Sequence, residues 1–224
     1  MKTFLIQTIN GEIKHDFSFS LIQSIEYNNW LYPNSYSYIL TDHTDWDISD
    51  MIPIGSVEFV LSFINNYRPI NVPSGLFDYA GRKILNGDEN DISTLSFVKS
   101  NDKIKSYTEI TDNAPKGNYQ ISEIIDIESE YRCFVFRNKL VGINYYTGDF
   151  KIFPDISVIE TMISVYNYSF PYTLDVGIAD GKTFVLEIHD FFSCGLYGFS
   201  DHRLLPIMFI DSFNHILNTT KNNC

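Results

Sequence analysis

The sequence is poor in cysteine, in positive charge and in long apolar runs. Its 224 residues include three cysteines, Cys133, Cys194 and Cys224, which are widely spaced and form no CxxC pair. This number and spacing exclude a disulfide framework and a cysteine zinc site, and they favour a reducing, cytoplasmic location. No apolar run approaches the roughly 20 residues of a membrane-spanning helix, and the apolar stretch near the N-terminus is too short for a signal peptide. We therefore expect a globular protein without a membrane partner.

The shortage of positive charge limits the possible partners further. Lys and Arg number 16 against 28 Asp and Glu, so the formal net charge is −12. Binding along a nucleic-acid backbone needs a basic surface, so general nucleic-acid binding is not expected. Hydrophobic residues reach 44% and aromatic residues 16%, which is ample for a buried core of bulky side chains that suit β-strands.

Predicted strands and helices interleave along the chain, which is typical of an α+β or α/β fold. Pro69, Pro73 and Gly75 interrupt the pattern and predict a boundary near residue 80. Residues 1–80 form the first predicted domain, with strands at 3–9, 35–41 and 51–54 and helices at 18–28 and after the N-cap residue Ser56. Residues 81–224 form the second, with strands at 97–99, 119–125, 131–136, 140–145, 172–178 and 183–189 and helices at 155–166 and 204–217.

Acidic side chains gather in the predicted hairpin around Asp180 and Gly181. The apolar positions of its two strands are all even-numbered, and they share one face only if paired residue numbers add to an even total. That register requires a three-residue loop, Asp180-Gly181-Lys182, and places Asp175 opposite Glu187 with His189 on the same side. The apolar positions concerned are Leu174, Val176, Ile178, Phe184, Leu186 and Ile188.

Carboxylates that face each other across a sheet repel, and a divalent cation is the usual compensation. Asp190 follows the same strand and adds a further carboxylate. A metal site is therefore one interpretation of this cluster. The alternative is a pair of solvated acids on an exposed sheet face, which a chain this acidic supplies by chance.

Four cations precede the hairpin in the sequence: Arg82, Lys83, Lys99 and Lys105. Separated cations aimed into one cleft suit a polyphosphate, because each neutralises a different oxygen. The alternative is that all four are ordinary surface cations. A GxxxxGK[ST] loop and a GxGxxG motif after the first strand are both missing, which excludes a P-loop and argues against a dinucleotide Rossmann site.

Several motifs together, in this order, resemble the ATP-grasp superfamily: Phe97-Val98-Lys99, Ser122-Glu123-Ile124-Ile125, Glu130-Tyr131-Arg132, Leu174-Asp175-Val176-Gly177 and Leu186-Glu187-Ile188-His189-Asp190. The segments at 52–59 and 195–198 resemble a compact clade of such proteins, often from phages and bacteria. The resemblance implies an α+β ATP-grasp fold whose two lobes, residues 81–120 and 121–224, hold ATP between them. A small α/β layer, residues 1–80, precedes these lobes.

The resemblance also implies a role for each matching residue. Lys99, Lys105 and Arg82 match phosphate-binding positions, with Lys83 as a rival of Arg82. The hinge that meets the adenine is implied at Glu123, Ile124 and Ile125, and the acid that binds the ribose hydroxyls is implied at Glu130. Arg132 and Lys105 are the implied catalytic cations, and Arg132 is suited to the transferring phosphate or the substrate carboxylate. The implied substrate loop includes Gly195, Tyr197 and Arg203.

Asp175, Glu187 and His189 match the family's magnesium triad in spacing. The last position is usually Asn, and magnesium prefers oxygen ligands to an imidazole. Either Asp190 takes over, or the second metal is weaker, or Mn²⁺ is better tolerated. A second departure is that residues 99–116 contain no glycine, although the family has a glycine-rich loop there.

The activity implied is that of an ATP-dependent ligase. Such an enzyme activates a carboxylate as an acyl phosphate and passes it to an amine or another nucleophile. ATP, Mg²⁺, a carboxylate substrate and an amine acceptor, either a small molecule or a peptide, are then the expected partners. Two alternatives remain: a catalytically impaired nucleotide-binding or interaction protein, suggested by His189 and the glycine-free segment, and a kinase-like use of the fold.

Overall fold

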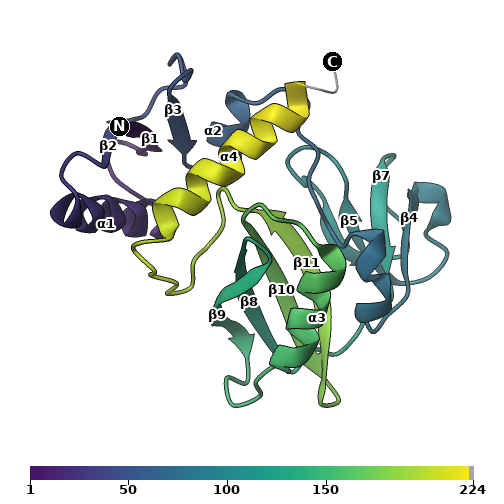
Figure 1. Ribbon diagram of the computed structural model, residues 1–224. Helices are drawn as coiled ribbons and strands as arrows, with labels where there is room; N and C mark the ends of the chain where they lie inside the picture. The colour runs from purple at the N-terminus through teal and green to yellow at the C-terminus, as the bar shows by residue number, and fades with distance from the viewer. Residues whose placement is uncertain (222–224) are drawn as a thin grey trace. The chain divides into compact units, whose positions relative to one another are not determined.

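The computed structural model describes residues 1–221, which form two compact units (Figure 1). The first unit combines Met1–Tyr67 with the C-terminal segment that begins at Phe191, and the second is Arg68–Asp190. This division differs from the predicted boundary near residue 80, because the C-terminal helix packs with the N-terminal segment. The functional division into residues 1–80 and 81–224 stays a prediction.

The first unit contains a three-stranded parallel sheet in the order β2-β1-β3. The central strand carries Phe4, Leu5 and Ile6, which are all fully buried, as expected for a parallel sheet covered on both faces. The predicted order of strand, helix, strand, strand, helix is confirmed, and the Ser56 hydroxyl caps its helix by accepting from the Phe59 amide. The elements are β1 Lys2–Gln7, α1 Asp16–Leu31, β2 Tyr36–Thr41, β3 Met51–Ile54, α2 Val57–Ser62 and α4 Leu205–Lys221.

The second unit contains two antiparallel four-stranded sheets. One sheet, here called the small lobe, has the order β4-β7-β5-β6, and the 3₁₀ helix η2 contacts β4, whereas η1 packs against α3 and against β11 of the other sheet. The other sheet has the order β11-β10-β8-β9 and forms the large lobe together with α3. The elements are η1 Ser74–Tyr79, β4 Ile84–Asp88, η2 Glu89–Asp91, β5 Ser96–Ser100, β6 Thr108–Thr111, β7 Asn118–Ser122, β8 Ser129–Phe136, β9 Lys139–Gly148, α3 Ile156–Tyr166, β10 Tyr172–Ala179 and β11 Lys182–Asp190.

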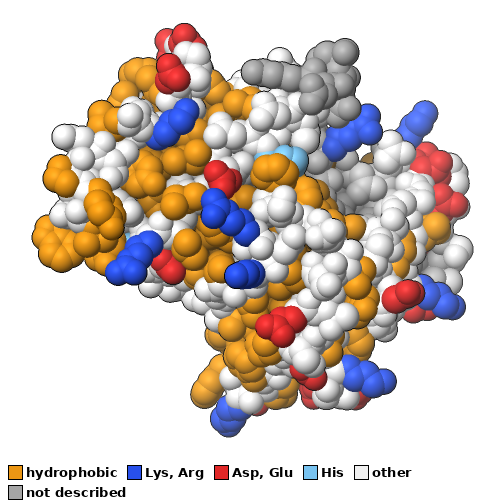
Figure 2. Space-filling model, viewed as in Figure 1, with side chains coloured by type: hydrophobic (Ala, Val, Ile, Leu, Met, Phe, Trp, Pro, Cys, Tyr) orange, Lys and Arg blue, Asp and Glu red, His pale blue; other side chains and the backbone are white. Residues whose placement is uncertain are grey.

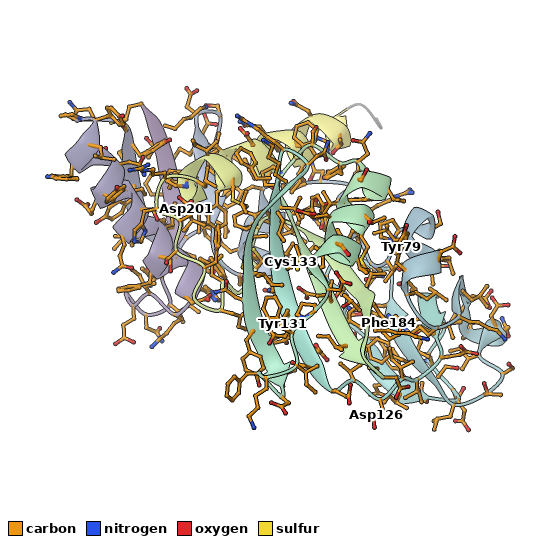
Figure 3. All side chains as sticks on the ribbon, turned by 60° about the horizontal axis from the view of Figure 1, so that its bottom comes forward. Tyr79, Asp126, Tyr131, Cys133, Phe184 and Asp201 are labelled. Atoms are coloured by element: carbon orange, nitrogen blue, oxygen red, sulfur yellow. The ribbon has the colours of Figure 1, made fainter. Side chains whose placement is uncertain are left out.

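Helix α3 covers one face of the large-lobe sheet, and the core lies between them (Figure 1). Asp155 caps this helix by accepting from the Ser157 amide at 2.8 Å. The side chains that fill the interior include Leu174 and Val176 from β10, and Ile159, Met162 and Ile163 from α3. Tyr131 and Cys133 from β8, labelled in Figure 3, belong to the same core. Because α3 takes this face, the opposite face of the sheet is left for polar side chains.

The β10–β11 hairpin corrects one prediction and confirms another. Asp180 and Gly181 have positive φ angles of 49° and 68°, and the flanking residues Ala179 and Lys182 pair, so the loop has two residues and the predicted three-residue loop is wrong. The register shifts after Asp175. Leu186 is the extra residue of this β-bulge. Beyond the bulge Asp175 pairs with Glu187 as predicted.

The bulge also changes which apolar residues are buried. Val185, which the predicted register turns outward, is fully buried in the core. Leu186, which it turns inward, lies against Gly177 on the opposite face. Phe184, also predicted on the apolar face, pairs with Gly177 and lies on the same face as Leu186. The bulge therefore keeps the acidic pair in place, but the predicted faces of Phe184, Val185 and Leu186 are wrong.

The described surface is mixed in character. Figure 2 shows hydrophobic side chains between charged ones on the face drawn, and on α1 the side chains of Phe19 and Trp30 are exposed. Within residues 1–221, none of the helices combines the length and the apolar composition needed to span a bilayer. Cys133 and Cys194 are buried free thiols, and burial raises the pKa of Cys133 far above its ordinary value. Cys224 lies outside the described residues.

Candidate active site

A cavity of about 450 Å³ lies between the small lobe and the large lobe, within the second unit. Its volume falls in the range of sites for small molecules and cofactors. The small lobe and its entry contribute Arg82, Phe97, Lys99, Ile110 and Ser122, the connection to the large lobe contributes Glu123, Ile124, Ile125 and Ile127, and the large lobe contributes Glu130, Arg132, Tyr146, Asp175, Leu186, Glu187 and His189. Most of the predicted nucleotide and metal residues therefore line one cavity.

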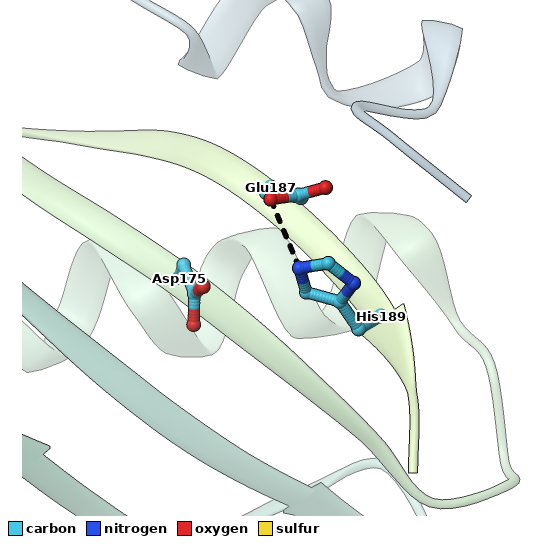
Figure 4. A group of neighbouring side chains, drawn as sticks. All are labelled: Asp175, Glu187 and His189. Atoms are coloured by element: carbon cyan, nitrogen blue, oxygen red, sulfur yellow. Dashed lines mark ion pairs between the residues drawn. The ribbon is translucent and has the colours of Figure 1, made fainter. Parts of the chain in front are cut away.

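Three potential metal ligands lie together on two neighbouring strands. Asp175 on β10 and Glu187 and His189 on β11 offer ligand atoms that all lie within 4.8 Å of one another. Figure 4 shows these side chains on one face of the strands, with α3 behind the sheet. The cluster follows from the register, because paired residues share a face and residues two apart on a strand point the same way.

Asp175 is neutralised by an arginine on the adjacent strand. Arg132 on β8 pairs in register with Asp175, and its guanidinium donates from Nε to Oδ1 at 2.8 Å and from Nη2 to Oδ2 at 2.7 Å. Both side chains are only 8% exposed. This bidentate geometry is the strongest form of carboxylate recognition by a side chain.

Glu187 is contacted by two lysines and by His189. Lys99 from β5 and Lys105 from the following loop both form ion pairs with its carboxylate, and His189 Nε2 lies 2.9 Å from Oε2. Burial opposes ionisation of Glu187, but the hydrogen bond of His189 and the ammonium groups of Lys105 and Lys99 outweigh burial. The pKa of Glu187 therefore lies well below its usual range. Protein cations thus relieve the repulsion between the two carboxylates, although the sequence suggested only a metal for this role.

Lys105 lies beside the cavity, and it is not among the described residues that line it. Its ammonium donates to the Ile70 carbonyl at 2.8 Å and lies 3.3 Å from His189 Nδ1, in addition to its ion pair with Glu187. Burial lowers the pKa of Lys105, and the neighbouring charge of Glu187 opposes this effect.

The hydrogen bonds of His189 indicate its tautomer. Nε2 lies next to a carboxylate, which only accepts, and Nδ1 lies next to an ammonium, which only donates. This network assigns the proton of a neutral imidazole to Nε2 and the lone pair to Nδ1. Burial lowers the pKa of His189, and Glu187 opposes the change, so the neutral form is consistent with the surroundings.

Arg82 and Lys83 have different environments. The Arg82 guanidinium donates from Nη1 to the Val185 carbonyl at 3.0 Å and lines the cavity; burial lowers its pKa. The Lys83 side chain is 91% exposed and lies 3.8 Å from Glu123. Of the two rivals, only Arg82 lies at the cavity.

The predicted adenine hinge follows the end of β7 at Ser122 and borders the same cavity. Glu130 lies at the start of β8 and is partly buried. Burial and the nearby charge of Asp175 raise the pKa of Glu130. Tyr146, which the sequence analysis does not select, also lines the cavity, and the Arg132 guanidinium carbon lies 5.8 Å from its ring centroid. Alternation along β9 places Tyr146 on a defined face, but no motif distinguishes it from the neighbouring tyrosine.

The remaining predicted residues are Asp190 and the three substrate-loop residues. The carboxylate of Asp190 is buried and lies 3.5 Å from the Tyr168 hydroxyl, and it is not part of the group formed by Glu187 and its neighbours. The reason is alternation, since residues one apart on a strand point to opposite faces. Gly195, Tyr197 and Arg203 belong to the first unit, and their role in substrate binding stays a prediction.

The donor set fits a hard divalent cation at the two carboxylates. A carboxylate has about four lone-pair positions, and the bonds to Arg132 use two of those on Asp175. Oxygen ligands suit Mg²⁺, whereas the imidazole of His189 is a less natural partner. Asp175 and Glu187 are therefore the residues of this group that would hold the metal.

Comparison with known proteins identifies the fold. The family model described as "ATP-grasp domain, R2K clade family 2" matches residues 79–207. Among solved structures, an ATP-grasp RimK domain protein from Sphaerobacter thermophilus superposes with a TM-score of 0.54 at 13% identity, covering 98% of this chain and 99% of that one. D-alanine–D-alanine ligase from Bacillus anthracis gives 0.52 at 13% identity with the same coverage. A search of curated proteins gives no match.

At such low identities the structural neighbours establish the fold alone, whereas the family model covers more than half of the chain. Both agree with the predicted α+β ATP-grasp fold. The chain therefore belongs to the ATP-grasp domain family, R2K clade family 2.

Proposed function

We propose that this ATP-grasp protein is an ATP-dependent ligase that joins a carboxylate to an amine or to another nucleophile. The observation that carries the proposal is the single cavity in which separated cations and a pair of facing carboxylates meet. Cations bind phosphate and substrate carboxylate groups, and paired carboxylates hold a divalent metal. Transfer of a phosphoryl group requires this combination.

In the proposed complex, ATP occupies the cavity with its phosphates next to Arg82 and Lys99. The adenine lies against Glu123, Ile124 and Ile125, and the ribose hydroxyls donate to Glu130. Mg²⁺, or alternatively Mn²⁺, is held by Asp175 and Glu187. When bound, the metal supplies positive charge that offsets the charge of the transferring phosphoryl group.

The proposed reaction has two steps. A substrate carboxylate oxygen attacks the γ-phosphorus of ATP, the bond to the β,γ-bridging oxygen breaks, and ADP leaves. An amine then attacks the acyl carbon, inorganic phosphate leaves with the C–O electron pair, and the amine loses a proton as the amide forms. Arg132, which Asp175 orients through two hydrogen bonds, offers its charge to the substrate carboxylate or to the phosphoryl oxygens.

One observation favours a second candidate function. Glu187 and His189 both contact the Lys105 ammonium, so part of the family's metal triad is engaged by the protein itself. A protein that binds nucleotide without turning it over is the corresponding alternative.

The deciding experiment measures ADP release in a screen of carboxylates with amines, including amino acids, peptides and polyamines, with Mg²⁺ or Mn²⁺. We expect ADP release that depends on both substrates and a product whose mass is that of the condensed pair. A stable phosphorylated product in place of an amide would indicate a kinase. Nucleotide binding without ADP release for any pair would indicate the impaired protein.

Replacing Glu130 with alanine is expected to weaken ATP binding by about 10- to 100-fold, because a hydrogen bond to a charged group contributes about 1.5–3 kcal/mol. The loss should be much smaller for 2′,3′-dideoxy-ATP, which lacks both hydroxyls. Calorimetric titration of the two nucleotides checks this difference. Glu128→Ala is the matched control, because it removes the same charge at an exposed position two residues away. An unchanged preference for ATP in Glu130→Ala would place the ribose elsewhere.

A further inference from the structure

The loop between β5 and β6 carries a lysine into the metal cluster. Residues 101–107 contain no glycine, and the side chain of Lys105 extends from this loop of the small lobe to Glu187 and His189 on β11. Its side chain is 16% exposed. Lys105 therefore contacts both of these residues from another lobe.

The three acceptors around the Lys105 ammonium are lone-pair atoms of kinds that also act as metal ligands. They are a carboxylate oxygen of Glu187, the Nδ1 atom of His189 at 3.3 Å and the carbonyl oxygen of Ile70 at 2.8 Å. An ammonium has three donors and no acceptor, so these three contacts account for all its hydrogen atoms. The Lys105 ammonium is saturated by protein groups.

The loop holds Lys105 in a conformation that ordinary side chains rarely adopt. Its φ angle is 51°, in the left-handed region, where non-glycine residues are strained. The Asp102 carboxylate stabilises the turn by accepting from the Ile104 amide at 3.2 Å and from the Ser106 amide at 2.9 Å. These hydrogen bonds fix the backbone at Lys105, and the ammonium is positioned by its own contacts with Ile70, Glu187 and His189.

We propose that the Lys105 ammonium takes the place of a second divalent cation between Glu187 and His189, so that the site binds one divalent cation. This inference rests on the proposed function of the cavity. A second ion at His189 needs a nitrogen lone pair, yet Nε2 faces Glu187 and Nδ1 faces Lys105. The remaining ion is held by Asp175 and Glu187. The ammonium supplies the other positive charge without depending on metal concentration.

The test counts bound Mn²⁺ by electron paramagnetic resonance, with and without the non-hydrolysable analogue β,γ-imido-ATP. The wild type is expected to bind one Mn²⁺ per chain at saturation with the analogue. Lys105→Met removes the charge and keeps much of the side-chain length, and it is expected to bind two Mn²⁺ per chain. Lys103→Met is the matched control, because it removes an exposed lysine of the same loop and should still bind one.

A further variant separates the ammonium from the imidazole. His189→Asn restores the usual oxygen ligand but keeps Lys105, so it is expected to bind one Mn²⁺. Two ions per wild-type chain, or none, would overturn the inference, and this result does not depend on whether Lys105→Met folds. A folded Lys105→Met protein that still binds one ion would also overturn it. Binding of the analogue is measured separately by calorimetry, and its failure to bind would contradict the proposed function. The Mn²⁺ count without nucleotide would still test the inference in that case.

Discussion

Replacing Arg132 with methionine is expected to lower the free energy of unfolding by about 3–5 kcal/mol, the effect typical of breaking a buried ion pair. The substitution keeps most of the apolar volume but leaves the Asp175 carboxylate, whose side chain is 8% exposed, without its bidentate partner. Urea denaturation measures the change. Arg137→Met is the matched control, because it removes an exposed arginine in the turn after the same strand, and surface substitutions of this kind change stability by about 0.5 kcal/mol or less.

The double variant Arg132→Met with Asp175→Leu tests the origin of this effect. Removing both partners leaves no buried charge, so we expect most of the lost stability to return. Nucleotide turnover should be absent in the double variant, because both charges have been removed from the cavity. A loss below 1 kcal/mol for Arg132→Met alone would mean that water reaches the carboxylate and that the pair is not effectively buried.

Replacing Glu187 with glutamine is expected to lower metal-dependent ATP turnover by roughly 10²- to 10³-fold, the effect of removing one group that stabilises charge in a transition state. Glutamine has nearly the same shape but does not supply a charged oxygen ligand. It also leaves the ammonium groups of Lys99 and Lys105 without the carboxylate that both of them contact. We therefore expect a loss of stability of about 1–3 kcal/mol in addition to the loss of turnover.

Two measurements check the Glu187→Gln prediction: ADP release with the substrate pair found in the screen, and urea denaturation without nucleotide. Glu160→Gln is the control, because it removes an exposed acid from α3. Turnover that stays at the wild-type level would show that Glu187 does not hold the metal. A gain in stability would show that the two carboxylates repel more strongly than the cations attract them.

In the β10–β11 hairpin the pairing of the two acidic residues was predicted correctly, but the length of the loop was not. The alternation of apolar residues correctly predicted that Asp175 pairs with Glu187, because the two-residue turn and the one-residue bulge beside that pair together give the same register as the predicted three-residue loop. The loop length was wrong, because two residues with positive φ make the turn and the bulge at Leu186 restores the register. A bulge depends on packing against neighbouring strands and leaves no reliable pattern in the sequence.

Two strands of the small lobe were also missed. The β4 segment, Ile84-Leu85-Asn86-Gly87-Asp88, is rich in residues with low β-propensity. It becomes a strand because β7 pairs with it along its whole length. Strand β6 is only four residues long, Thr108–Thr111, and it pairs with β5. In both cases pairing between strands outweighs the local preference of the residues.

By itself the sequence predicted most of the long elements, because periodicity and capping are local properties of the chain. The resemblance of its motifs to the ATP-grasp superfamily implied the fold and most of the charged residues that line the cavity. Only the tertiary structure decided which charges meet. Arg132 and Asp175 are 43 positions apart and Lys105 and Glu187 are 82 apart, and periodicity carries no information over such separations. Burial in a shared cavity selects these pairs, because a carboxylate removed from water requires a partner wherever the folded chain brings one within reach.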